Sequence, residues 1–157
     1  MQTQRNGGAI DVRAEAAIDA STALVWQVIS DYEKLPGFVP GLKRSVITSR
    51  QGARLMVEQS GEAGFLFFTV PIEVRLEVQE SPPDVIVSRA VAGNLRRMNG
   101  RYEIRAAGPG TVTLHYTGLI EPGFSLPPIF GMAVLQMNIE AQFEAMVNEI
   151  RRRAAER

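Results

Sequence analysis

The end of the chain limits its fold most, because an unbroken amphipathic pattern follows a pair of prolines at positions 127 and 128. Apolar side chains recur there at intervals of three and four residues, at Met132, Leu135, Ile139, Phe143, Met146 and Ile150. Proline is tolerated in a first helical turn, so the pattern predicts a helix from Pro128 to Arg153. At about 1.5 Å per residue this helix is about 39 Å long. It could lie across an entire sheet.

Most of the preceding chain alternates apolar and polar residues, as strands with one buried face do. The first alternating segment is 10–19, and the later ones are 43–49, 54–60, 66–79, 85–91, 97–105 and 111–120. Short turns rich in glycine and proline join the later segments. Consecutive strands with short connections form an antiparallel meander. We therefore expect one strand, a helical region and then a six-stranded meander.

The helical region lies between the first strand and the meander. Leu24, Val25, Val28 and Ile29 recur at helical spacing, and Ser21 or Thr22 can cap this helix. Prolines and glycines at 36, 37, 40 and 41 then prevent a long continuation. The pattern predicts two short helices and a turn that act as a lid.

In two predicted strands, the choice of which side chains point towards the core decides which acidic or basic groups could take part in acid–base chemistry. In 54–60, an inward Leu55 and Val57 would bring Gln59 inward, whereas an inward Met56 would bring Glu58. In 111–120, Tyr116 shares the apolar face, so His115, the only histidine, should point towards water. A single histidine without cysteine offers no zinc site, and we expect no metal and no cofactor.

Composition places the chain among ordinary globular proteins. It has 157 residues, with 17 basic and 17 acidic side chains, so net charge gives no reason to expect nucleic-acid binding. We expect one domain over 8–153, with flexible termini at 1–7 and 154–157. The absence of cysteine excludes disulfides and thiol nucleophiles.

The cytoplasm is the expected location. The first residues lack the apolar core of a signal peptide, and no segment approaches the roughly 18 consecutive apolar residues of a membrane span. The most apolar stretch, 124–137, is interrupted by polar residues, glycine and prolines, and could at most touch a bilayer surface transiently. No nucleotide-binding glycine loop and no G-x-S-x-G nucleophile motif occurs.

Three segments carry a family resemblance: VWQVISDYEKLPGFVPGLKRSVI, GNLRRMNGRYEI and LHYTGLIEPGFSLPP. Together with the final helix, they resemble the START-like (SRPBCC) superfamily over residues 8 to 153, in its polyketide cyclase/dehydrase and coenzyme Q-binding branch. The resemblance implies an α+β helix-grip fold, in which a curved antiparallel sheet wraps around a long C-terminal helix and two short helices follow the first strand. It also implies an apolar cavity between sheet and helix.

On this reading the protein binds or transports a hydrophobic small molecule, a lipid or isoprenoid quinone, and no catalysis is required. The expected lining residues are Phe68, Val70, Met98, Tyr102, Tyr116, Met132, Leu135, Ile139 and Phe143, with Phe38 and Phe124 at the mouth. A dry cavity of roughly 300 Å³ would cost about 7 kcal/mol at about 24 cal/mol per Å³. A filled, hydrated or collapsed interior is therefore expected rather than a dry void.

Two other functions fit the same pattern. A polyketide aromatase/cyclase could use Tyr102, Tyr116 and an inward Arg96 to hold an enolate, with Glu58 as the base if it faces inward with a raised pKa. A protein-interaction module of the same fold could use surface charges as contacts, namely Lys43, Arg44, Arg96 and Arg97.

Overall fold

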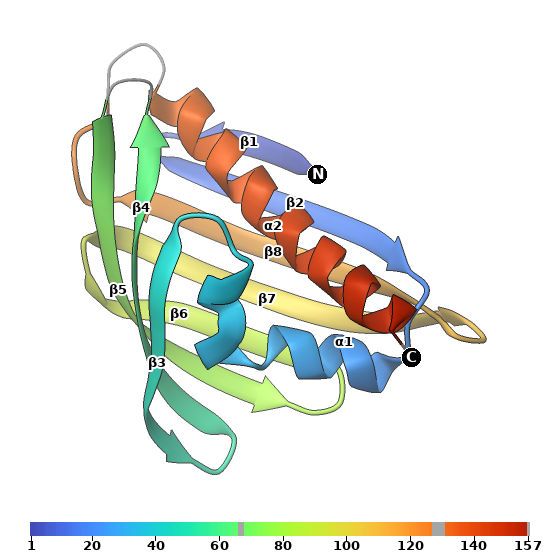
Figure 1. Ribbon diagram of the computed structural model, residues 1–157. Coiled ribbons are helices and arrows are strands. Elements are labelled where there is room, and N and C mark those ends of the chain that lie inside the picture. Colours follow the sequence, from blue (N-terminus) through green and yellow to red (C-terminus); the bar gives the residue numbers. More distant parts are fainter. Residues whose placement is uncertain (66–67, 127–130, 157) are drawn as a thin grey trace.

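A curved antiparallel sheet grips one long helix in the computed structural model, which describes residues 1–65, 68–126 and 131–156 except the side chains of Phe65 and Phe68 (Figure 1). The strands are β1 (Gln2–Asn6), β2 (Ala9–Ile18), β3 (Leu42–Gln51), β4 (Arg54–Phe65), β5 (Phe68–Ser81), β6 (Val85–Gly93), β7 (Leu95–Gly108) and β8 (Thr111–Pro122). Their order in the eight-stranded sheet is β1-β2-β8-β7-β6-β5-β4-β3. The predicted six-stranded meander, β3 to β8, is thus confirmed, and its last strand, β8, pairs with β2.

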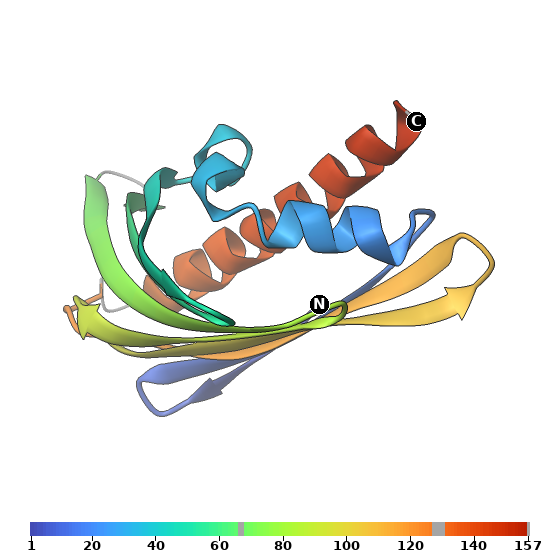
Figure 2. The ribbon, with the colours of Figure 1, turned by 90° about the horizontal axis from the view of Figure 1, so that it is seen from below.

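The helices are α1 (Thr22–Ile29), the 3-10 helix η1 (Tyr32–Gly37) and α2 (Gly131–Ala155). All three lie on the concave side of the sheet (Figure 2). The Ser21 hydroxyl caps α1 by accepting a hydrogen bond from the Leu24 amide at 3.1 Å. The α+β helix-grip fold expected from the sequence is confirmed, including the two short helices after the first long strand.

Both ends of the chain continue in regular elements beyond the expected domain of residues 8–153. Residues 2–6 form strand β1, which pairs with β2 and places Thr3 opposite Val12. The Gln136 side chain of α2 donates to the Thr3 hydroxyl at 3.0 Å. At the other end, α2 continues to Ala155, and its expected start at Pro128 lies outside the described residues.

The core joins the concave face of the sheet to one stripe of α2. Leu135, Ile139, Phe143, Met146 and Ile150 are all buried, and Val147 extends the same stripe. Burying each large apolar side chain contributes about 1.5–3 kcal/mol, so this stripe holds the helix against the sheet along its length. In the described part of the chain, no helix is both long and apolar enough to cross a membrane.

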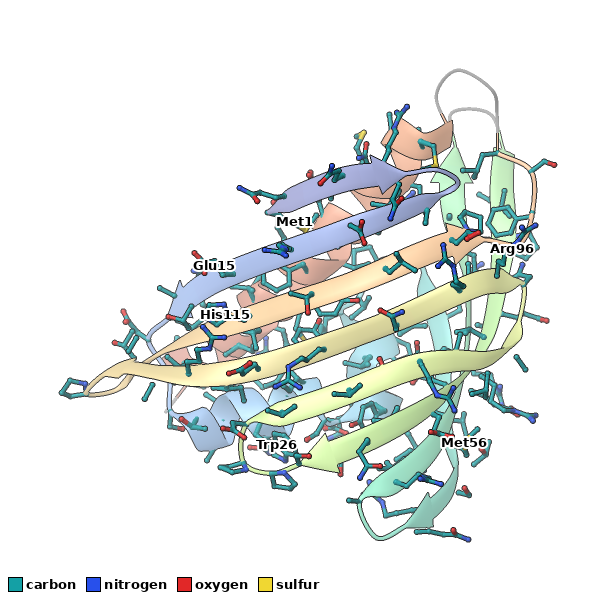
Figure 3. All side chains as sticks on the ribbon, turned by 180° about the vertical axis from the view of Figure 1, so that it is seen from behind. Met1, Glu15, Trp26, Met56, Arg96 and His115 are labelled. Carbon is teal, nitrogen blue, oxygen red and sulfur yellow. The ribbon has the colours of Figure 1, made fainter. Side chains whose placement is uncertain are left out.

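The convex face carries His115, as its strand parity predicted. Its Nδ1 atom lies 3.4 Å from a carboxylate oxygen of Glu15 on the neighbouring strand β2, and Figure 3 shows both residues on this outer face. His115 therefore lies on the opposite side of the sheet from α2.

Candidate ligand-binding cavity

Two neighbouring cavities lie between the concave face of the sheet and α2. The inner cavity has a volume of about 180 Å³ and extends beneath η1, and the outer cavity has about 110 Å³. Leu42, Gln59, Met98, Ile120, Ile139 and Gln142 line both of them. Because the two cavities share these wall residues, they are adjacent to each other along α2.

Tyr102 and Tyr116 form the main polar feature of the inner cavity. They occupy directly opposite positions of β7 and β8, and their rings are 4.8 Å apart between centroids with a tilt of 43°. Neither hydroxyl has a hydrogen-bond partner among the residues that the structure describes. Burial raises the pKa of Tyr116 to about 12, and burial followed by the nearby Tyr116 raises the pKa of Tyr102. Both phenols are therefore neutral hydrogen-bond donors at ordinary pH.

Two glycines make room for the Tyr116 ring. Gly100 and Gly118 are opposite each other in β7 and β8, and a Cβ atom on either would lie 2.8 Å or 2.6 Å, respectively, from the Tyr116 hydroxyl oxygen. The ring can therefore lie against the sheet only because both positions lack side chains. A glycine inside a strand is the sequence signal for such a close approach.

The remaining polar groups of the inner cavity are neutral as well. Ser88 lies opposite Gly100 on β6, and Gln59 donates from its Nε2 atom to the Ser45 hydroxyl at 3.2 Å. Gln142 donates to the Pro40 carbonyl at 3.4 Å. No charged side chain lines the inner cavity within the described ranges 1–65, 68–126 and 131–156.

The third tyrosine of the chain, Tyr32, also lines the inner cavity, but its hydroxyl is already engaged. It donates to a carboxylate oxygen of Glu80 at 2.7 Å, and Glu80 in turn lies 3.3 Å from the Arg50 guanidinium. Burial and the Glu80 carboxylate raise the pKa of Tyr32. This bond ties the start of η1 to strand β5, so the helical cover over the cavity is fixed at that end.

The outer cavity lies beside the start of β3 and the end of β4. Its walls there are Gly41, Leu42, Gly61, Glu62 and Ala63, facing Asn138 and Gln142 of α2. Glu62 pairs with Lys43 at 3.1 Å. Neither Phe38 nor Phe124, the residues expected at the mouth, is among the described residues that line this cavity.

Comparison with known proteins assigns this architecture to a family. The model of the family described as polyketide cyclase/dehydrase and lipid transport matches residues 18–147, most of the chain. The chain belongs to this family. The polyketide cyclase/dehydrase family predicted from the sequence is thereby confirmed. A comparison of the sequence with curated proteins gives no match.

Solved structures share the fold of this family member. The Zhui aromatase/cyclase from a Streptomyces species is 17% identical, with a TM-score of 0.77 over 92% of this chain and 95% of that chain. A START superfamily protein from Mycobacterium smegmatis is also 17% identical, with a TM-score of 0.73 over 90% and 97%. Norcoclaurine synthase from Thalictrum flavum is 14% identical, with a TM-score of 0.66 over 95% and 88%. At these identities the likeness establishes the fold alone.

Within this family fold, the structure brings together six of the residues expected to line the cavity. Met98, Tyr102, Tyr116, Leu135, Ile139 and Phe143 all line one or both cavities. Sequence reasoning missed Leu42, Ser88, Ile120 and Gln142, and left Gln59 as one of two alternatives. Ser88 and Ile120 could have been found from strand parity, whereas Leu42 and Gln142 required the placement of η1 and α2.

Four other expected lining residues lie elsewhere. Val70, Met132, Phe38 and Phe124 are not among the described residues that line the two cavities, and the side chain of Phe68 lies outside the described part. The ring of Phe38 lies 5.8 Å from the guanidinium carbon of Arg153 at the end of α2. Met132 packs with Leu135 against the start of β2.

Two residues proposed for a cyclase site face away from the cavity. Leu55 and Val57 are fully buried, so Gln59 points inward and Glu58 points outward. Glu58 accepts a hydrogen bond from Arg75 at 2.8 Å, which holds its pKa below the ordinary value. The role of Glu58 as an inward base with a raised pKa is therefore wrong.

Arg96 is the second of these residues, and its predicted inward position is also wrong. Its side chain is 72% exposed and pairs with Glu121 at 3.9 Å (Figure 3). The cause is an irregularity in the pairing of β7 with β8 between Leu95 and Arg97, which breaks the simple alternation of faces.

The surface charges considered for a protein-interaction module all have acidic neighbours. Arg44 pairs with Glu58 at 3.6 Å, and Arg97 pairs with Glu121 at 2.9 Å. Lys43 pairs with Glu62 and Arg96 with Glu121, as described above. These cations are therefore largely compensated by carboxylates of the same chain.

Proposed function

We propose that this family member binds or transports a hydrophobic small molecule, of the lipid or isoprenoid quinone class, without a required catalytic step. The observation that carries the proposal is the inner cavity, whose described lining is apolar apart from neutral hydroxyl and amide groups. A few convergent polar groups in an apolar cavity are typical of ligand sites. General acid–base catalysis is most efficient when a group near the ligand has a pKa close to the working pH, whereas the titratable groups that line this cavity are tyrosines with raised pKa values. The lining therefore supports a binding role.

The free energy that a dry cavity of this size would cost supports the same function. At about 24 cal/mol per Å³, the inner volume of 180 Å³ costs about 4 kcal/mol and the outer volume of 110 Å³ about 3 kcal/mol. This is a large part of a typical folding stability of about 5–15 kcal/mol. A ligand that fills the space restores the lost packing contacts, so occupancy should stabilise the fold.

Native mass spectrometry of the freshly purified protein, followed by extraction and identification of the bound molecule, tests this function. We expect a stoichiometric hydrophobic ligand in the wild type. Replacing Met98, which lines both cavities, by tryptophan should fill the space and eliminate the ligand. Met137→Trp is the matched control, because Met137 lies on α2 with 66% of its surface exposed.

The control separates cavity binding from surface binding. A ligand that disappears in Met98→Trp and persists in Met137→Trp supports binding in the cavity. A hydrophobic ligand that persists in both variants would place binding elsewhere and contradict the proposal. Protein that carries no ligand and takes up none from vesicles of mixed lipids and quinone would also contradict it.

A polyketide aromatase/cyclase is the second candidate, favoured by the family description and by the two phenols in the inner cavity. Phenol donors could stabilise an enolate oxygen, although Glu58 cannot serve as the base. Turnover of a poly-ketone mimic, lowered in Tyr102→Phe and Tyr116→Phe, would support this function. Absence of turnover in the wild type would leave binding as the function.

A further inference from the structure

The tyrosines of this chain differ in whether their hydroxyls already have a partner. Buried tyrosine hydroxyls usually form hydrogen bonds, and Tyr32 follows this rule by donating to Glu80 at 2.7 Å. Tyr102 and Tyr116 line the same cavity without a partner among the described residues. Because both hydroxyls reach the open space of the cavity and have no partner among the described residues, these two donors are suited to a hydrogen-bond acceptor that enters the cavity.

The two phenols are also held in place before any ligand arrives. Tyr116 lies over the backbone of Gly100 and Gly118, and the Tyr102 ring packs on it at 4.8 Å. Ser88, opposite Gly100 on the next strand, adds a third hydroxyl beside this pair. Donors whose positions are fixed by packing lose little freedom when a ligand binds.

The charge of the lining decides what kind of acceptor fits. A ligand carboxylate would be buried without a cation, since the inner cavity has no charged side chain among its described residues. Burying an unpaired charge is far less favourable than burying a neutral group that forms hydrogen bonds. A carbonyl oxygen has two lone pairs and can accept from both phenols.

We propose that Tyr102 and Tyr116 form a carbonyl-recognition site, which selects neutral ligands that carry a ketone or quinone oxygen over hydrocarbons and carboxylates of the same shape. The inference rests on the proposed binding function and names its ligand class. Gly100 and Gly118 act as positioning residues for the Tyr116 hydroxyl.

Three small aromatic probes of nearly equal shape test the proposal: acetophenone, α-methylstyrene and benzoate. They differ mainly in one group, which is a ketone, a methylene in place of the ketone oxygen, or a carboxylate. Dissociation constants are measured by NMR titration with the full-length protein. We expect acetophenone to bind about fivefold more tightly than α-methylstyrene for one hydrogen bond, or up to about thirtyfold for two. Benzoate should bind more weakly than either neutral probe.

The double variant Tyr102→Phe/Tyr116→Phe removes both hydroxyls and keeps both rings. It should reduce the preference for acetophenone to about equal binding of the two neutral probes, with thermal unfolding used to verify the fold. Tyr32→Phe is the matched control, because that hydroxyl already donates to Glu80. It should change the affinity of both neutral probes by the same factor and preserve their ratio.

The outcomes separate this inference from the proposed function. Equal binding of acetophenone and α-methylstyrene to the wild type, or a preference that survives the double variant, would overturn carbonyl recognition while leaving hydrophobic binding intact. Benzoate binding as tightly as acetophenone would also overturn it. If no probe binds at the inner cavity, the binding function fails and carbonyl recognition fails with it.

Discussion

Replacing Gly100 by alanine tests the central packing feature of the cavity. The new Cβ atom would lie 2.8 Å from the Tyr116 hydroxyl oxygen, and ring carbons of Tyr116 lie at 3.0 Å and 3.2 Å from the same point. All three contacts are closer than ordinary van der Waals distance. The tyrosine ring must therefore move into the cavity, and its packing on Tyr102 must change.

The expected effect follows from two opposing terms. Overpacking of a well-packed site destabilises a protein by about 1–3 kcal/mol. Alanine in place of glycine restricts the unfolded chain and offers about 0.4–1 kcal/mol of stabilisation where the native backbone accepts it. The contact with Tyr116 should dominate, giving a net loss of about 1–2 kcal/mol. For a domain of this size, the melting temperature should fall by about 2–8 °C.

Urea unfolding of four variants provides the assay. Gly64→Ala is the matched control, because Gly64 also lies in a strand and a Cβ atom there would meet nothing within 4 Å. This control should be neutral or slightly stabilising. Tyr116→Ala and the double variant Gly100→Ala/Tyr116→Ala complete a double-mutant cycle, with an expected coupling energy of about 1–2 kcal/mol.

Two results would refute this reasoning. The first is a Gly100→Ala protein as stable as Gly64→Ala, which would mean that the ring accommodates the methyl group without loss. The second is an equal penalty for Gly100→Ala with and without the Tyr116 side chain, which would assign the effect to the backbone rather than to the tyrosine.

Three further predictions concern hydrogen bonds and ionisation. Tyr32→Phe should lower the free energy of unfolding by about 1 kcal/mol, measured in urea, because the Glu80 carboxylate loses its phenol donor. All three tyrosines have pKa values raised above 10.0, so the unfolded chain ionises first, and stability should fall as the pH rises above about 10. Urea unfolding at several alkaline pH values checks this, and stability that is constant there would contradict the pKa directions. Hydrogen bonds from Arg152 and Arg153 lower the pKa of Glu149 from 4.5 to about 2, so its stabilisation should be lost as the pH falls through that range. Glu149→Gln should remove this pH dependence, with a loss of at most about 1 kcal/mol near neutral pH because Arg152, its main partner, is largely exposed and solvent screens the pair.

Local sequence patterns correctly predicted which side chains point inward wherever that direction depends only on the residue's own strand or helix. The period of the last helix identified Leu135, Ile139 and Phe143 as inward residues, and each lines a cavity. Parity in β7 and β8 placed Tyr102 and Tyr116 on the concave face and His115 on the convex face. These predictions depend only on the geometry of a regular element, which the sequence reports directly.

Other features depended on partners far along the chain. Strand β1 has the polar sequence QTQRN, and it forms because β2 offers a free edge. The facing of Glu58 was ambiguous until the pairing of β4 with β3 and β5 decided it. Arg96 faces outward because an irregularity interrupts the alternation that parity assumes.

The sequence by itself therefore determined the helices and strands other than β1, their order, the family and the tyrosine pair of the candidate site. Only the tertiary structure decided that the two phenols lack partners in the described chain while Tyr32 has one, that two glycines support Tyr116, and that Gly61 and Gln142 line the outer cavity. The physical reason is that periodicity fixes where a side chain points. What it meets there depends on segments tens of residues away, which only packing brings together.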